Sequence, residues 1–282
     1  MTDASYALAV VSSMAYGAAD FLGGLAAKRG STVFSVVVVS QSVGLVLVLL
    51  SLPFLPPALP RAVDFAWGAA AGLAGGIGLA LLYRGLAVGA MSVVAPVTAV
   101  CAVIVPVAVG LALGERPSPP AAMGVLLAVV SIVLISRTGH TEEGKHGAIG
   151  LSIALASGIA IGVFLVCLER TETAAGLWPL VAARVVSVSF FTAAGLISRE
   201  KLVPRRESMP IVIGGGALDM AANVLYLLAV RQGPLSIVAT LTSLYPASTI
   251  LLARIVLRER LRLVQGVGVA CAATAIVLIV SG

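Results

Sequence analysis

The sequence carries few charged residues for its length. Asp, Glu, Lys and Arg make up 11% of the 282 residues, whereas a soluble domain carries about a quarter. Hydrophobic residues make up 60% of the chain. This balance excludes an ordinary soluble domain and indicates a membrane protein. The net charge of +6 arises from basic residues clustered between apolar runs, a distribution typical of membrane orientation signals, so we expect no nucleic-acid partner.

Cysteine and histidine are also scarce. The chain has three cysteines, each alone in an apolar run: Cys101, Cys167 and Cys271. This arrangement favours neither a disulfide framework nor a zinc site. The two histidines share a polar link with two acids: His140, Glu142, Glu143 and His146. We expect these side chains to be solvated, and we expect neither a metal site nor a cofactor.

Catalytic and nucleotide-binding motifs are missing. The sequence has no HExxH, no GxSxG and no GxxxxGK[ST] pattern, and no histidine lies in an apolar run. We therefore expect a protein that is not an enzyme. Energy for uphill movement of a solute would have to come from an ion gradient, for which acidic residues in membrane spans are the usual means.

Long apolar runs are abundant. A membrane-spanning helix needs about 20 mostly apolar residues, and ten runs of suitable composition occur, near 5–27, 33–54, 65–86, 90–113, 119–136, 147–168, 177–198, 209–230, 235–256 and 262–280. Pro, Gly and charged residues separate them. The first run lacks a basic leading segment and is too long for a signal peptide, so we expect it to span the membrane.

Part of the sequence occurs twice. Residues 92–136 align without gaps to residues 236–280, a shift of 236 − 92 = 144 positions, with 14 identities in 45 positions. The identities include Thr98 with Thr242, Gly124 with Gly268, and a Glu-Arg pair, which shared apolar bias would not align. We infer a duplication with one repeat over 1–136, a polar linker over 137–146 and a second repeat over 147–282.

The duplication determines the expected topology. Each repeat holds five predicted spans, an odd number, so the second copy must cross the membrane in the opposite sense to the first. The predicted fold is an all-α integral membrane protein with ten transmembrane helices arranged as two inverted five-helix repeats. This architecture is typical of transporters.

The basic residues predict an orientation. Loops after odd-numbered spans, with the adjoining helix ends, hold twelve Lys and Arg residues, whereas loops after even-numbered spans hold four. The positive-inside rule then places the odd loops, including 199–206 and 258–262, in the cytoplasm and both termini outside.

Ionisable residues inside spans are candidate functional residues, because each costs at least about 2.5 kcal/mol to insert. Asp219 lies near the middle of the eighth run, and Asn223 and Tyr226 follow at i+4 and i+7 on the same helix face. This stripe predicts a cavity lining with Asp219 as its main charged group. The alternative is a polar cluster that only ties helices together.

The first and seventh runs supply further candidates. Asp20 lies in the first run with Tyr16 at i−4 on the same face, and we expect it to act as the secondary partner of Asp219. A carboxylate near the membrane interface that pairs with Lys28 or Arg29 is the alternative. Arg184 in the seventh run is a natural counter-ion for either aspartate, and pairing and substrate binding are both open to it.

The duplicated pairs Glu115-Arg116 and Glu259-Arg260 end the fourth and ninth runs, where we expect them to anchor a helix and cap the next turn. With Gly124 and Gly268, they give each half a Glu-Arg…Gly pattern. On this pattern and the duplicated five-span half, the whole chain resembles the drug/metabolite transporter superfamily and, more narrowly, its ten-span EamA-type members. The resemblance implies secondary transport of small organic metabolites or drugs, often export, through a central cavity, without a cofactor.

Two further expectations come with the resemblance. Small four-span relatives keep an acidic residue in their first helix for proton and cation exchange, and Asp20 occupies the first predicted helix here. The family usually has both termini in the cytoplasm, which is the reverse of what the Lys and Arg count predicts.

The predicted function is therefore ion-gradient-coupled transport across the cytoplasmic membrane. The expected solute is a small organic metabolite, amine, amino-acid-like molecule or drug, moved outward with a proton or another cation as the coupling partner. Two alternatives stay open: a flippase for a lipid-linked molecule, which would need fewer charged contacts, and a non-transporting membrane scaffold, which needs neither acids inside its spans nor an inverted repeat.

Overall fold

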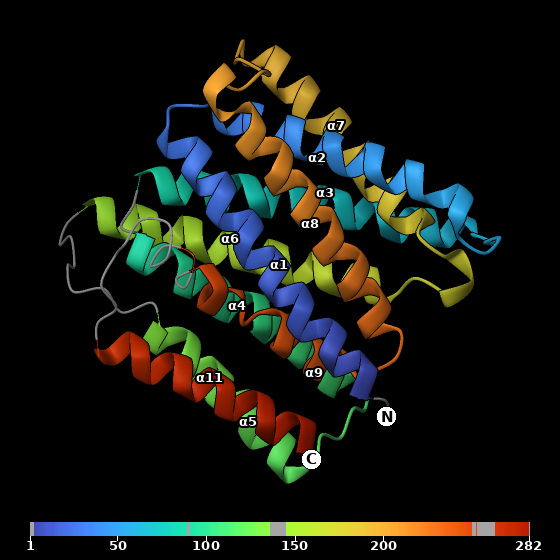
Figure 1. The fold of residues 1–282 in the computed structure, drawn as a ribbon, viewed down its shortest axis with the longest axis vertical. Helices are drawn as coiled ribbons and strands as arrows, with labels where there is room; N and C mark the ends of the chain where they lie inside the picture. Colours follow the sequence, from blue (N-terminus) through green and yellow to red (C-terminus); the bar gives the residue numbers. More distant parts are fainter. Residues whose placement is uncertain (1–2, 89–90, 136–144, 250–251, 253–262, 282) are drawn as a thin grey trace.

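The chain folds into helices joined by short loops (Figure 1), and the computed structural model describes residues 3–88, 91–135, 145–249, 252 and 263–281. No strand occurs in these ranges. The helices are α1 (Asp3–Lys28), α2 (Val33–Ser51), α3 (Ala62–Val88), α4 (Met91–Ala112), α5 (Pro119–Ile135), α6 (Lys145–Glu169), α7 (Trp178–Ile197), α8 (Met209–Val230), α9 (Leu235–Thr242) and α11 (Leu263–Ser281). Three short 3-10 turns lie in the loops: η1 (Leu52–Phe54), η2 (Thr173–Ala175) and η3 (Arg206–Ser208).

The helices confirm a multi-pass membrane protein. Six of the described helices, α1, α2, α3, α6, α7 and α8, are long and apolar enough to cross a bilayer. Shorter apolar stretches occupy 98–112, 119–134 and 266–279 in α4, α5 and α11. The first eight predicted runs each coincide with one helix, whereas the ninth, 235–256, does not.

The ninth run is interrupted. Helix α9 ends at Thr242, Ser243 and Leu244 form a turn, and helical structure resumes at Tyr245. Pro246 contributes to the break, because its ring has no N–H to donate to the carbonyl of Thr242 and clashes with that carbonyl. The Thr240 hydroxyl, which donates to the carbonyl of Ser236 at 2.6 Å, also competes with the backbone pattern.

The equivalent helix of the first repeat is continuous. A shift of 144 residues places Ala102 of α4 where the second repeat has Pro246, and α4 is helical throughout Met91–Ala112. Helix α4 contains two prolines, Pro96 and Pro106, without a break. Proline is therefore one contribution to the break after α9, and the hydroxyl-rich segment before Pro246 is another. The two repeats therefore differ where α9 ends.

The helix contacts follow the repeat. The shift carries α1 to α6, α2 to α7, α3 to α8, α4 to α9 and α5 to α11. Helix α1 packs along α8, and the equivalent pair, α6 and α3, packs in the same way. Helix α2 packs on α8, and its equivalent, α7, packs on α3. Each of these contacts between the halves therefore occurs twice, with the roles of the repeats exchanged. Helices α5 and α11, which are equivalent to each other, pack together at one side of the molecule (Figure 1). The halves interlock instead of forming separate bundles.

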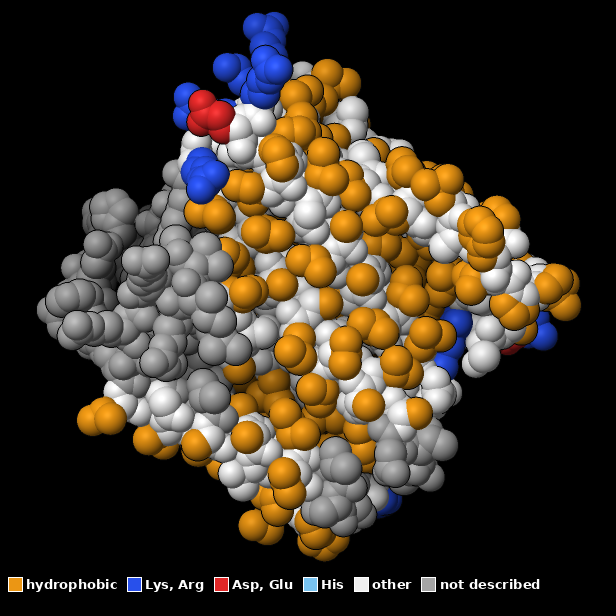
Figure 2. Space-filling model, in the orientation of Figure 1, with side chains coloured by type: hydrophobic (Ala, Val, Ile, Leu, Met, Phe, Trp, Pro, Cys, Tyr) orange, Lys and Arg blue, Asp and Glu red, His pale blue; other side chains and the backbone are white. Residues whose placement is uncertain are grey.

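On the face shown in Figure 2, hydrophobic side chains cover the middle and the charged side chains lie toward the edges. Large exposed side chains such as Leu50, Leu126, Leu196 and Val277 are between 62% and 69% accessible. Water would penalise this apolar area, whereas hydrocarbon accepts it, so these positions face lipid.

At one end of the molecule, which we call the Asp64 end (Arg61, Asp64, Glu172 and Arg231), the loops after α2, α6 and α8 are joined. The buried Asp64 carboxylate accepts the backbone N–H of Arg61 at 2.9 Å and that of Glu172 at 2.8 Å. The Arg61 guanidinium pairs with the Glu172 carboxylate at 2.7 Å. The Arg231 guanidinium donates to three acceptors of the α6–α7 loop: the carbonyls of Glu172 and Gly176 and the Thr171 hydroxyl.

The opposite end, which we call the Arg205 end (Arg29, Ser31, Thr32, Lys201 and Arg205), joins the loops after α1 and α7. Arg205 donates to the carbonyl of Arg29 at 3.2 Å. The Thr32 hydroxyl donates to the carbonyl of Lys201 at 2.7 Å. In Figure 1 these loops lie at the upper left, away from the α2–α3 and α6–α7 loops on the right.

Candidate functional site

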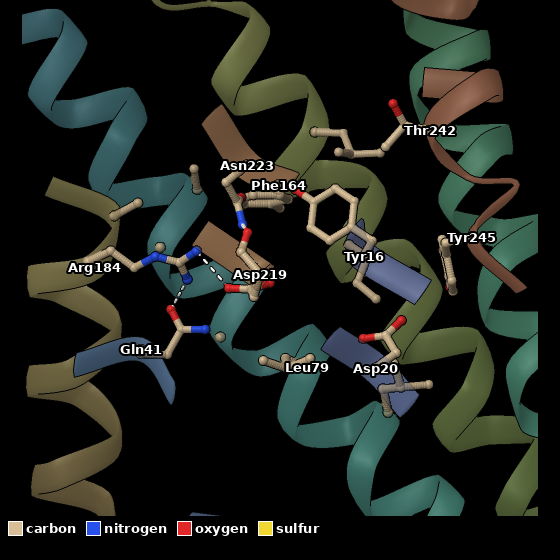
Figure 3. Close-up of a pocket in the computed structure, with 18 of the residues that line it drawn as sticks. Tyr16, Asp20, Gln41, Leu79, Phe164, Arg184, Asp219, Asn223, Thr242 and Tyr245 are labelled. Atoms are coloured by element: carbon tan, nitrogen blue, oxygen red, sulfur yellow. Dashed lines mark hydrogen bonds and ion pairs between the residues drawn. The ribbon is translucent and has the colours of Figure 1, made fainter. Parts of the chain in front are cut away.

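A cavity lies between the two halves, about midway along the helices (Figure 3). Helices α1, α2 and α3 line it from the first repeat, and α6, α7, α8 and the end of α9 line it from the second. Its water-accessible volume is about 70 Å³. One water needs about 10–15 Å³ on this measure, so the space corresponds to roughly five to seven waters. A small solute fits this conformation, and a large lipid-linked molecule does not.

Arg184 of α7 binds Asp219 of α8 on one side of the cavity. The guanidinium lies 2.7 Å from the Asp219 carboxylate, and the two side chains are only 7% and 16% exposed. Arg184 also donates to the side-chain oxygen of Gln41 in α2. The pair therefore joins three helices, and its two charges neutralise each other inside the cavity wall.

Asp20 of α1 lies on the other side of the cavity without a basic partner among the described residues. Figure 3 shows its carboxylate turned toward the space between Tyr16 and Tyr245. Because Arg184 is occupied by Asp219, the ionised lining carries a net charge of −1, located at Asp20. The sequence predicts Asp219 as the main charged group and Asp20 as its secondary partner; in the structure Asp219 is paired with Arg184, and Asp20 is the aspartate without a basic partner in the described residues.

Residues at the break after α9 add further polar groups to the cavity lining. Thr242, Ser243 and Tyr245 line it, and the hydroxyls of Thr242 and Tyr245 are buried without a hydrogen-bond partner among the described residues. Thr242 is one of the repeat identities, but none of the three residues is predicted from the sequence as a cavity residue. The available signal was a proline following several hydroxyl residues inside an apolar run, the pattern of an interrupted span.

The predicted Asp219 stripe enters the cavity only in part. Asn223 lines the cavity, and its side-chain N–H donates to the carbonyl of Asp219 at 2.6 Å. Tyr226 does not line it: the ring is fully buried against α6, and its hydroxyl donates to the carbonyl of Leu165 at 2.9 Å. Tyr226 therefore ties α8 to α6, while Tyr16 on α1 reaches the cavity as predicted from its face.

Close backbone contact shapes the cavity walls. A Cβ at Gly72 of α3 would lie 2.1 Å from the carbonyl oxygen of Ala183, so α3 and α7 touch beside Arg184. A Cβ at Gly17 of α1 would lie 1.9 Å from the Ser248 hydroxyl, which places the resumed helix directly against α1. Glycine is required at both positions because any side chain would separate the helices.

Of the duplicated Glu-Arg pairs, only the first lies in the described residues. Glu115 accepts the backbone N–H of Leu235 at 2.6 Å and that of Ser236 at 3.0 Å. It thus caps the start of α9 in the other repeat, whereas the sequence suggested the turn after its own helix. Gly114, with φ of +91°, allows α4 to end just before it. Arg116 is exposed, and Glu259 and Arg260 lie outside the described residues.

These features define a class of protein: a polytopic membrane protein whose two repeats enclose a small cavity with charged and polar side chains in a largely apolar wall. The family comparison gives the narrower identification. The model of the EamA-like transporter family matches residues 4–137 and again residues 148–281. The chain belongs to this family, and with it to the drug/metabolite transporter superfamily. It is thus a membrane transporter built from a duplicated domain, in a family whose members are generally not enzymes.

Comparison with known proteins adds support for the fold. A solved structure titled only "Crystal structure of protein" is similar over 99% of this chain and 96% of its own, with a TM-score of 0.77 and 16% sequence identity. At that identity the likeness concerns the fold alone. No curated protein matches this sequence. Among the described residues, no group of three or more His, Cys, Asp or Glu side chains is placed to hold a metal ion.

Proposed function

We propose that this transporter carries a small, positively charged organic solute through the cavity in exchange for a proton or another cation. The observation that supports it is the Asp20 carboxylate, which lines a cavity shared by both repeats and has no basic partner in the described chain. A buried anion without a partner is costly, so it favours a state in which a cation or a proton neutralises it.

The proposed membrane topology is ten spans in two inverted repeats. The helix contacts recur under exchange of the halves, and five crossings per half would reverse the second copy. Such a fold allows helices from both repeats to rearrange about a central site, which then opens to one side at a time.

The proposed coupling uses Asp20 as the shared group. Ionised Asp20 holds the cationic solute, and protonated Asp20 releases it, so the two cations compete for one carboxylate. If the site changes sides only when Asp20 is neutralised, proton entry drives solute exit. Asp219 then acts mainly as the counter-ion that keeps Arg184 in place between α2, α7 and α8.

Currents recorded from proteoliposomes on a solid-supported membrane test this proposal, with a panel of amines, amino acids and drugs as solutes. Wild-type protein should give solute-evoked currents that change with the pH gradient. Asp20→Asn should abolish them while the protein remains monodisperse. Thr274→Val, at an exposed position of α11 away from the cavity, serves as the control and should behave as wild type. Unchanged gradient-driven transport in Asp20→Asn, on both sides of neutral pH, would refute the role of Asp20.

Asp219→Asn should lose stability, whereas Asp20→Asn should lose transport alone. It leaves the Arg184 guanidinium buried without an anion, which destabilises a protein by roughly 3–5 kcal/mol. We expect a lower apparent melting temperature and reduced expression, in contrast to Asp20→Asn. A stable Asp219→Asn protein that lacks transport would return the main role to Asp219.

Location and direction complete the proposal: the cytoplasmic membrane, with export of the solute. The Lys and Arg count places the Arg205 end in the cytoplasm. Labelling of an Arg206→Cys variant in intact cells measures the orientation. Efficient reaction with an impermeant reagent would place this end outside and support the arrangement usual for the family.

A further inference from the structure

The cavity carries polar atoms that its own walls leave without partners. Asn223 and Thr242 are each 2% exposed and Tyr245 is 8% exposed. Five atoms of lining residues have no hydrogen-bond partner in the described residues: the Asn223 side-chain oxygen, the Tyr16, Thr242 and Tyr245 hydroxyls, and Nε of Arg184. Buried polar atoms are nearly always satisfied in folded proteins, so a group of them around one cavity indicates a polar ligand.

The chemistry of Asn223 is determined by its backbone contact. Only the amide NH₂ can donate to a carbonyl, and it does so to the carbonyl of Asp219 at 2.6 Å. The atom left over is the side-chain oxygen, which only accepts hydrogen bonds. A ligand group that meets this oxygen must therefore carry an O–H or N–H.

Asp20 and Asn223 mark different parts of the cavity. They lie on different helices, α1 and α8, and Figure 3 shows the Tyr16 ring between Asn223 on one side and Asp20 and Tyr245 on the other. A ligand that meets both needs its positive charge at one end and its hydrogen-bond donor at the other. The faces of Tyr16 and Phe164 provide apolar and aromatic contact for the part between.

The basic side of the cavity is already occupied. Arg184 is the only basic residue in the described lining, and its two terminal nitrogens bind Asp219 and Gln41. Its third nitrogen, Nε, has no partner in the described residues, but it lies against Gly44 of α2, which is not part of the lining. A carboxylate on the ligand would find no free cation and would lie near two buried acids. The lining therefore disfavours zwitterionic amino acids relative to the amines that correspond to them.

We propose that the ligand of this cavity is a small amine without a carboxylate, carrying a hydroxyl or N–H donor at the end opposite its ammonium group. This inference rests on the proposed function only for the negative charge of Asp20. The size fits, because space for five to seven waters is about 150–210 Å³ of liquid volume. A single-ring amine is of this size.

Isothermal titration calorimetry on the purified protein in lipid nanodiscs tests the inference with four matched compounds. 4-Hydroxyphenethylamine has both groups, phenethylamine lacks the donor, 4-methoxyphenethylamine blocks it, and tyrosine adds a carboxylate. We expect the first to bind at least about tenfold more tightly than each of the others, which is the usual effect of losing one buried hydrogen bond or leaving a charge unpaired.

The Asn223→Leu variant tests whether Asn223 is the group that recognises the hydroxyl of 4-hydroxyphenethylamine. It removes the acceptor at nearly constant size and should make 4-hydroxyphenethylamine and phenethylamine bind equally, whereas Thr274→Val should keep the difference. Because the four compounds are compared on wild-type protein, the result does not depend on the variant folding.

Equal binding of the four compounds, tighter binding of tyrosine, or no binding of 4-hydroxyphenethylamine would each overturn the inference. The transport currents with Asp20→Asn test the proposed function separately: coupled transport of another class of solute would uphold that function while this inference falls.

Discussion

At the Asp64 end a buried carboxylate and two arginines join the loops after α2, α6 and α8, whereas at the Arg205 end neutral acceptors join the loops after α1 and α7. The 144-residue shift makes these ends equivalent. Arg61 corresponds to Arg205, and Asp64 corresponds to Ser208. Where one end has Glu172, the other has Lys28, which cannot form an ion pair with an arginine.

In the proposed inverted topology, this difference makes the two ends of the transporter unequal. In an inverted repeat the two ends serve as the barriers on the two sides of the membrane, and equal barriers would leave the two open states equally populated. Burial lowers the pKa of the Arg231 guanidinium from its ordinary value, and the Asp64 carboxylate opposes this effect. Arg231 therefore stays charged, and its hydrogen bonds hold the α6–α7 loop at the Asp64 end. The Asp64 end should therefore open less readily than the Arg205 end.

Removing the buried carboxylate should have the largest effect on this difference. Asp64→Ala leaves the backbone N–H groups of Arg61 and Glu172 without their acceptor, which should cost about 2–4 kcal/mol of stability. The apparent melting temperature should fall by several degrees. Its repeat-equivalent control is Ser208→Ala, because the Ser208 hydroxyl has no partner in the described chain. If both substitutions lower the melting temperature equally, the ends do not differ as described.

Loss of the Arg231 guanidinium should have an intermediate effect. Arg231→Leu leaves three acceptors of the α6–α7 loop without a donor, and we expect a loss of about 1–3 kcal/mol. Arg84→Leu, at an exposed site on α3, is the control for removing a positive charge. Thermal unfolding in detergent compares the two variants. An Arg231→Leu protein as stable as Arg84→Leu would show that the Arg231 hydrogen bonds contribute little to the stability of the protein.

Exchange of the exposed ion pair should have the smallest effect. Glu172→Lys copies the residue of the Arg205 end and breaks a pair whose side chains are 69% and 45% exposed, so we expect less than about 1 kcal/mol. Hydrogen exchange of the amides at 171–176 should become faster and approach that at 29–32. Glu200→Lys, another exposed acid, should leave this exchange unchanged. Exchange at 171–176 that is already as fast as at 29–32 in wild type would contradict the comparison.

Much of the fold follows from composition, because apolar runs of membrane length form helices in a bilayer. The site follows only in part. The sequence placed Arg184 near both aspartates, but the choice of Asp219 depends on how α2, α7 and α8 pack. Tyr226 shares a helix face with Asp219, yet seven residues of helix place it about 10 Å further along, where α6 covers it. The polar end of α9 depends on a local break in the helix. A hydropathy average over a whole membrane span does not reveal such a break.

Glu115 has a consequence for how the protein is made. It belongs to the first repeat, and it accepts the first two backbone N–H groups of α9 in the second. During synthesis the acidic cap is therefore in place before the ribosome has produced the helix that needs it. A first repeat expressed alone would keep an unused acid, and a second repeat alone would start α9 with two free amides. Because both repeats lie in one chain, the acid and the two amides that it accepts are always produced together.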